Sequence, residues 1–61
     1  MGFVLRKFDR RRGECVFYRS HPGGVSFGPL QMADTFEHRA DAVRTAAAFD
    51  GWLDVIPKPK I

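Results

Sequence analysis

The sequence predicts an α+β fold, a single small two-layer domain in which one helix covers a mainly antiparallel sheet. Phe36–Gly51 is the only stretch with a clear helical period. The residues before it alternate between two faces and are divided by turn signals, which indicates strands. The expected element order is β-β-β-α-β, and the chain, 1–61, is expected to form one domain.

The first two strands are expected at Phe3–Asp9 and Glu14–Ser20, which place successive side chains on opposite faces. Arg10–Gly13 between them indicates a turn, because Gly13 can adopt a left-handed backbone conformation. The two runs therefore predict an antiparallel hairpin. Periodicity leaves open which face is buried. The face away from the helix is expected to hold some of Val4, Phe8, Val16, Tyr18 and Ile56.

A shorter third strand is expected at Val25–Phe27. The turn signal His21–Gly24 precedes it, and Gly28-Pro29 ends it because proline has no backbone N–H to donate. Leu30–Thr35 then connects this strand to the helix. The apolar residues of the connection are expected to lie beneath the helix, namely Leu30, Met32 and Ala33.

The helix is expected within Phe36–Gly51, FEHRADAVRTAAAFDG. His38 can act as its N-cap, and Gly51 can adopt the positive φ that ends a helix. An apolar stripe at three- and four-residue spacing predicts the face that packs on the sheet. The stripe consists of Ala42, Val43, Ala46, Ala47 and Phe49.

A last strand is expected at Trp52–Ile56, followed by a frayed tail at 57–61. A right-handed helical crossover would place this strand beside the first and parallel to it. The expected order of strands in the sheet is therefore 4-1-2-3. Trp52 would either cover the end of the helix as part of the core or provide an exposed contact.

The composition predicts a folded cytoplasmic domain, with 44% hydrophobic and 28% charged residues. Cys15 is the only cysteine, which suits a reducing compartment. No signal-peptide core is present and no apolar run approaches the roughly 20 residues that cross a bilayer, so no membrane partner is expected. Ten Lys and Arg against seven Asp and Glu give a net charge of +3, which permits nucleic acid or an acidic protein surface as partner.

The residues predict a protein that is not an enzyme. Ser20 and His21 are adjacent and would point apart on an extended strand, so they cannot form a nucleophile–base pair. Cys15 with His21 or His38 is the other arrangement, but a buried Cys15 and two exposed histidines are expected instead. One cysteine and two histidines at no recognised spacing predict no metal site. We therefore expect no cofactor and no small-molecule substrate.

A basic cluster surrounds the first turn, where Arg6, Lys7 and Arg10–Arg12 lie within seven residues. Arginine beside an exposed aromatic ring is typical of protein hot spots and of nucleic-acid-binding surfaces. The other interpretation is a charged sheet edge that prevents aggregation. The residues expected to bind a partner are Arg10, Arg11, Arg12, Tyr18 and Arg19.

The segments FVLRKF, ECVFYRS, VSFGPLQMADTF, HRADAVRTAAAF and LDV together resemble small phage- and prophage-borne β-β-β-α-β proteins. In these proteins Ala-x-x-Phe, here Ala33–Phe36, leads from a short third strand into an alanine-rich helix. Phe27 stands where that strand typically has Trp. The group includes anti-CRISPR proteins, so the resemblance implies a non-enzymatic inhibitor that acts in the cytoplasm of a host bacterium.

Such an inhibitor would bind a host protein or ribonucleoprotein complex, in this case a CRISPR effector, and block its DNA recognition or nuclease recruitment. The alternative function is a small basic nucleic-acid-binding module that uses the Arg10–Arg12 hairpin directly. The two differ in their response to salt, since phosphate binding weakens steeply as ionic strength rises.

Overall fold

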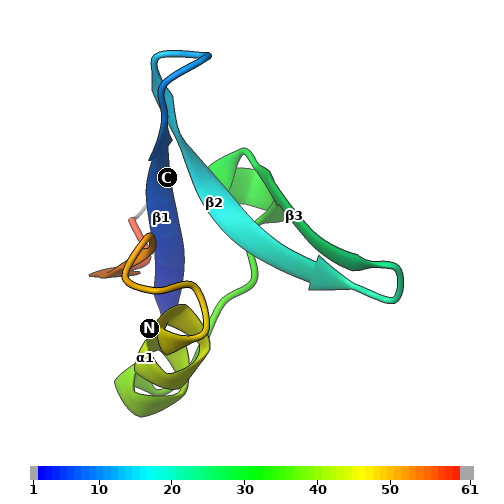
Figure 1. Ribbon diagram of the computed structural model, residues 1–61. Coiled ribbons are helices and arrows are strands. Elements are labelled where there is room, and N and C mark those ends of the chain that lie inside the picture. The colour runs from blue at the N-terminus through cyan, green and yellow to red at the C-terminus, as the bar shows by residue number, and fades with distance from the viewer. Residues whose placement is uncertain (1, 60–61) are drawn as a thin grey trace.

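Six elements follow one another in the computed structural model, which describes residues 2–59. They are β1 (Phe3–Asp9), β2 (Glu14–His21), β3 (Gly24–Gly28), the 3-10 helix η1 (Leu30–Met32), α1 (Arg39–Ala47) and β4 (Asp54–Pro57). The strands form one sheet in the order β3-β2-β1-β4, with α1 lying against it (Figure 1). The expected α+β class, element order and strand order are therefore confirmed.

The direction of β4 differs from the expectation. β4 runs antiparallel to β1, from Asp54 opposite Arg6 to Pro57 opposite Phe3. The parallel arrangement is wrong because the connection after η1 already returns the chain to the start of β1, where Phe36 pairs with Phe3. α1 then carries the chain back, and β4 must run the opposite way.

Backbone pairing beside β1 continues beyond Pro57. The Lys58 N–H donates a hydrogen bond of 2.8 Å to the Gly2 carbonyl oxygen. The paired region therefore includes two residues of the segment 57–61 that was expected to fray. Residues 60 and 61 lie outside the described residues.

β1 and β2 pair only from Arg6–Asp9 to Glu14–Phe17 and then diverge (Figure 1). Residues 34–36, which we call the wedge, occupy the space between them. The Asp34 N–H donates to the Tyr18 carbonyl at 3.0 Å, and Phe36 exchanges two hydrogen bonds of 2.7 and 2.8 Å with Phe3. The wedge thus supplies the backbone partners that the diverging strands no longer give each other.

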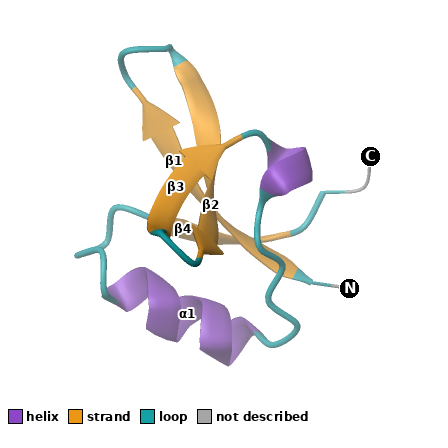
Figure 2. Ribbon diagram, turned by 90° about the vertical axis from the view of Figure 1, so that its right-hand side faces the viewer, coloured by secondary structure: helices purple, strands orange, loops and turns teal. Residues whose placement is uncertain are grey.

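The chain crosses the sheet at the wedge, so η1 and α1 lie on opposite faces (Figures 1 and 2). η1 packs against β2. Leu30 and Met32 were expected beneath the helix. They lie instead on the opposite face of the sheet from α1. Met32 remains 49% exposed there.

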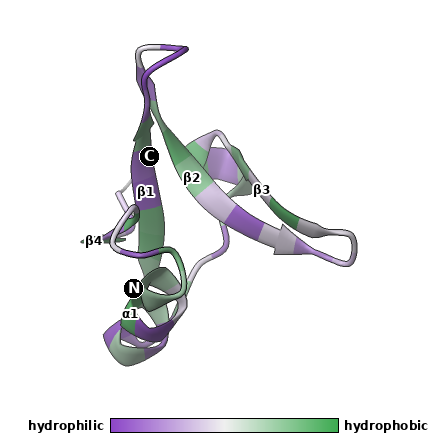
Figure 3. Cartoon of the chain, in the orientation of Figure 1, coloured by the Kyte–Doolittle hydropathy of each residue, from purple (hydrophilic) through white to green (hydrophobic). Residues whose placement is uncertain are grey.

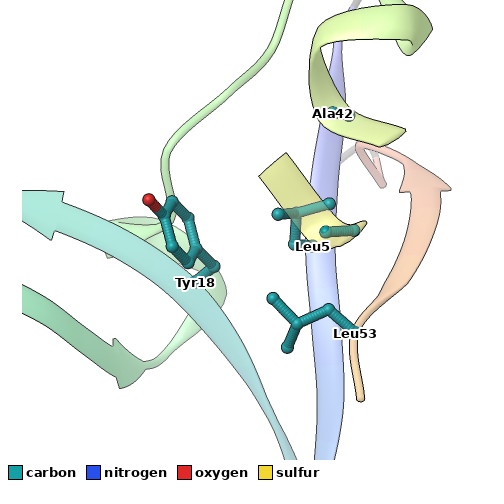
Figure 4. Close-up of a cluster of buried hydrophobic side chains, with 5 residues drawn as sticks. Leu5, Tyr18, Ala42 and Leu53 are labelled. Carbon is teal, nitrogen blue, oxygen red and sulfur yellow. The ribbon is translucent and has the colours of Figure 1, made fainter. Parts of the chain in front are cut away.

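The core lies between the sheet and α1, where Leu5, Tyr18, Ala42, Ala46 and Leu53 form one buried cluster (Figure 4). Partly buried Phe3, Phe27, Phe36, Phe49 and Val55 pack around it. The register settles which face each residue occupies. Val16 and Tyr18 share the α1 face with Leu5, whereas Val4, Phe8 and Ile56 share the other.

α1 is shorter than the helical period suggests, and only Ala42 and Ala46 of its stripe are fully covered. Val43 is 41% exposed, which shows that a narrow strip of small side chains faces the sheet. His38 is the N-cap residue, as expected, although its side chain makes no capping hydrogen bond. Gly51 has the expected positive φ, of 79°.

Candidate functional site

A groove lies between the hairpin end of β1 and the loop that joins α1 to β4. Its lining comes from two segments that are distant in sequence, 7–11 and 50–54. The lining residues are Lys7, Phe8, Asp9, Arg10, Arg11, Asp50, Gly51, Trp52 and Asp54. The turn between β1 and β2, at the top of Figure 3, is hydrophilic. The groove therefore joins a charged turn to a loop that contains the chain's single tryptophan.

The groove exists because β4 does not extend alongside the last three residues of β1. The pairing of the two strands stops at Arg6 and Asp54, while β1 continues to Asp9. The loop before β4 turns through two left-handed residues, Asp50 with φ 52° and Gly51 with φ 79°. Trp52 then donates its N–H to Phe49 within the loop. Its backbone is therefore not available to extend β4 along β1.

Two aromatic side chains line the groove in exposed positions. Phe8 is 61% exposed and Trp52 is 75% exposed. Large rings that remain in water gain apolar contact when a partner covers them, and tryptophan is enriched at interface hot spots. Of the two places considered for Trp52, the structure shows the exposed one.

The arginines of the turn differ in their electrostatic surroundings. Arg12 lies 3.8 Å from the Asp9 carboxylate and 3.9 Å from that of Glu14. Arg10 and Arg11 are exposed and form no ion pair with any residue of 2–59. Exposed ion pairs contribute less than about 1 kcal/mol, so those of Arg12 hold it only weakly. Arg10 and Arg11 are therefore free to pair with an acidic partner.

The groove carries both signs of charge. Its lining holds three basic residues, Lys7, Arg10 and Arg11, and three acidic ones, Asp9, Asp50 and Asp54. Asp54 also lies 3.7 Å from Arg6, which is beside the groove. A lining with equal numbers of opposite charges lacks the single-sign potential that attracts a phosphate backbone.

Asp9 shapes the turn that presents these arginines. Its carbonyl oxygen accepts a 2.8 Å hydrogen bond from the Gly13 N–H, and its carboxylate accepts one of 3.0 Å from the Arg11 N–H. Gly13 has a φ of 66°, the left-handed conformation that the sequence indicated. The basic turn is therefore a defined structure.

Tyr18, one of the expected partner-binding residues, does not face outward. It is only 8% exposed, and its ring packs edge-on against Phe27 and Phe49 at centroid distances of 6.2 and 5.7 Å. The expectation was wrong because the register of β2 turns Tyr18 toward α1. Its contribution is to the core.

Arg19 lies away from the basic turn. It pairs with Ser26 of β3 and follows Glu14 by five residues, which places it about 17 Å along the strand from the turn. The structure thus brings Arg10 and Arg11 together with Phe8 and Trp52. It does not bring them together with Tyr18 and Arg19.

Cys15 is exposed rather than buried, contrary to expectation. It pairs with Phe8 on the face away from α1, near the turn, where Phe8 is exposed too. His21 lies six residues further along β2, about 20 Å in an extended strand, so the two side chains cannot form a catalytic pair. Among residues 2–59 no three potential metal ligands gather at one point. The absence of enzymatic activity remains a prediction.

Sequence reasoning missed Phe8 and gave Trp52 only as an alternative. A usable signal was present in Asp50-Gly51, a turn pair directly before Trp52. The pair permits a loop position for Trp52 but does not require one, because β2 begins at Glu14 directly after the turn glycine Gly13. It also does not place Phe8 beside Trp52.

The sequence matches no known protein family, and no curated protein or solved structure is significantly similar to the chain. None of the helices in the described part of the chain has the length and apolar character needed to cross a bilayer. The groove and the sequence resemblance are therefore the grounds for a functional inference.

Proposed function

We propose that this protein is a non-enzymatic binding protein whose groove holds a protein partner. The observation that supports this most directly is the pair of exposed rings, Phe8 and Trp52, beside Arg10 and Arg11, which form no ion pair within residues 2–59. Arginine and tryptophan are the residues most enriched at the energetic centre of protein interfaces. An apolar surface edged by charged groups is also typical of a binding site.

A protein partner fits the groove better than nucleic acid does. Phosphates would meet Asp50 and Asp54 as well as the arginines, and the lining has equal numbers of each charge. The chain's net charge of +3 is also small. The alternative of a nucleic-acid-binding module retains one supporting observation, which is that Arg10 and Arg11 are exposed and form no ion pair with another described residue.

The proposed biological role is inhibition of a host defence complex. It follows from the resemblance to small phage-borne proteins, a group that includes anti-CRISPR proteins. The partner in this proposal is a CRISPR effector, and occupation of the groove blocks either DNA recognition or nuclease recruitment. A role of this kind needs binding alone, which suits a small domain with an exposed interface.

The test is a phage plating assay in bacteria with an active, phage-targeting CRISPR system, repeated over several effector types. The wild-type protein is expected to restore plating with at least one type. Trp52→Ala should weaken binding to that purified effector by about 30-fold or more, since a central aromatic contributes roughly 2 kcal/mol. Met32→Ala is the matched control, because Met32 is exposed on the η1 side of the sheet.

Equal binding by the Trp52→Ala and Met32→Ala variants would remove the groove from the proposal. If the protein inhibits none of the effector types and a different protein is recovered from host lysate, the partner is that protein and not a CRISPR effector. The nucleic-acid alternative predicts capture that is lost after nuclease treatment and an affinity that falls log-linearly with salt.

A further inference from the structure

The backbone of β1 has an open hydrogen-bonding position in the groove. In an antiparallel pair, alternate residues direct their N–H and C=O toward the same neighbouring strand. On the β4 side, Gly2 bonds to Lys58, and the alternate residues Val4 and Arg6 pair with Ile56 and Asp54. The next residue in this series is Phe8. No described residue pairs with it on that side, because the β1–β4 register ends at Arg6.

Trp52 is the residue that the continued register would place opposite Phe8. Two left-handed residues and the buried side chain of Leu53, which is 6% exposed, hold this loop in another path. The Trp52 N–H is bonded to the Phe49 carbonyl at 3.0 Å. The position beside Phe8 that a longer β4 would fill is therefore not occupied by a strand, and Trp52 lines the same groove.

We propose that the groove takes an extended peptide segment of the protein partner, which adds as a short strand beside Phe8 in line with β4. This inference rests on the proposed function and names its binding mode. Strand addition to a sheet edge gives affinity through backbone hydrogen bonds and specificity through side-chain contacts. Phe8 offers one N–H and one C=O for this purpose.

The walls of the groove define the chemistry of the segment. Phe8 and Trp52 favour one large apolar side chain in the peptide. Arg10 and Arg11, at the turn end, favour an acidic residue beyond it, because arginine binds carboxylates in a two-point geometry. The preferred segment is thus extended, with an apolar residue followed or preceded at short spacing by Asp or Glu.

The sheet has a second open edge, at β3, which serves as an internal comparison. β3 pairs with β2 through Gly24, Ser26 and Gly28 in alternation, so the N–H and C=O of Val25 and Phe27 face outward. This edge has no charged residue. One ammonium group, that of Lys7, lies 4.2 Å from the centroid of the Phe27 ring, whereas the groove has two guanidinium groups, of Arg10 and Arg11, that form no ion pair with a described residue. The groove is therefore the favoured edge, and pairing at β3 is an outcome that the experiment must separate.

The probe is a library of short random peptides, selected on the immobilised full chain and then on the Arg10/Arg11→Ala and Trp52→Ala variants. Enriched peptides should contain the apolar and acidic pair and should not bind the variants. Residue-resolved hydrogen exchange is then measured with one synthetic peptide. We expect about tenfold or greater protection of the Phe8 amide, as one backbone hydrogen bond of about 1.4 kcal/mol gives, with the Val25 and Phe27 amides unchanged.

A second measurement uses the same peptide methylated on the one backbone nitrogen that faces Phe8. Loss of about tenfold in affinity is expected, because the peptide can no longer donate to the Phe8 carbonyl. Strand addition beside Phe8 is overturned if the peptide binds without protecting the Phe8 amide, or if it protects the Val25 and Phe27 amides instead. It is also overturned if no peptide is enriched on the wild-type chain over the variants. Protection of Phe8 that grows with protein concentration and needs no peptide would show a second copy in the groove and also overturn it.

Failure of this inference can be told apart from failure of the proposed function. If Trp52→Ala abolishes effector binding but the complex leaves the Phe8 amide exchanging freely, the function stands and strand addition is wrong. If the peptide protects Phe8 while Trp52→Ala still inhibits the effector fully, strand addition stands and the proposed function is wrong.

Discussion

The carboxylate of Asp34 binds Ser20 through two hydrogen bonds, although the residues are 14 positions apart in the chain. One Oδ2 atom accepts the Ser20 backbone N–H at 2.9 Å and the Ser20 hydroxyl at 2.7 Å. The Asp34 N–H donates to Tyr18 on the same strand. Asp34 thus supplies hydrogen-bond partners for Tyr18 and Ser20 of β2, where this strand no longer pairs with β1.

We predict that Asp34→Ala lowers the free energy of unfolding by about 1–2 kcal/mol, because the Ser20 N–H loses its acceptor. Ser20→Ala, which removes only the hydroxyl, should cost less. Urea titrations give both values. Glu37→Ala is the control, since Glu37 is exposed in the same connection. Equal midpoints for the Asp34 and Glu37 variants would show that the wedge does not depend on this carboxylate.

Tyr18 provides a test of core against interface. Tyr18→Ala should cost about 3–5 kcal/mol, which a domain of this size cannot absorb, so circular dichroism is expected to show an unfolded chain. Tyr18→Phe keeps the ring among Phe27 and Phe49 and should retain both the fold and partner binding. If the Tyr18→Phe variant folds but no longer binds the partner, the Tyr18 hydroxyl takes part in the interface.

Gly51→Ala should destabilise the protein by about 1–2 kcal/mol, because its φ of 79° is costly for a residue with a Cβ atom. Gly28→Ala is the matched control. Gly28 lacks a positive φ, and an added Cβ would meet no atom within 4 Å. Thermal melts of the two variants should therefore separate clearly. A lower melting temperature for Gly28→Ala than for Gly51→Ala would contradict the described loop conformation.

Trp52 should behave spectroscopically as a surface residue. It is the only tryptophan and is 75% exposed, so acrylamide should quench fluorescence nearly as well in the folded protein as in urea. Its emission should shift to shorter wavelength when the partner covers it. Strong protection from acrylamide in the free protein would place the ring in the core instead.

Two charge-matched variants decide which surface binds. Arg10/Arg11→Ala alters the groove, and Arg39/Arg44→Ala removes the same charge from α1, where both residues are exposed. We expect the first to weaken partner binding and the second to leave it nearly unchanged, with similar melting temperatures for both. Loss of binding only in the helix variant would assign the function to α1. Comparing binding at several salt concentrations separates local contacts from general attraction.

Local chemistry was enough to predict most of the fold. β1 has the expected bounds, and the β1–β2 turn forms at Gly13, because alternation and turn preference depend on neighbouring residues. The direction of β4 could not be predicted in this way. It depends on the pairing of Phe36 with Phe3, which involves distant segments and leaves no periodic pattern.

The candidate site was predictable only in part, for a similar reason. Arg10 and Arg11 were identified because charge is visible in the sequence itself. Tyr18 was misplaced since a strand pattern does not tell which of its two faces is buried. The groove depends on where β4 starts relative to β1, and that offset arises from the loop at Asp50 and Gly51.

The wedge has a consequence for how the chain folds. Continued beyond Arg6 and Phe17, the β1–β2 register would pair Leu5 with Tyr18 and Phe3 with Ser20. Hairpins close within microseconds, whereas contacts between distant segments form later because of their loop-closure cost. The same backbone groups therefore have two rival sets of partners, one local and early, the other distant and native. A hairpin that zips fully before the wedge docks would have to open its Phe3–Leu5 half before the native sheet can form.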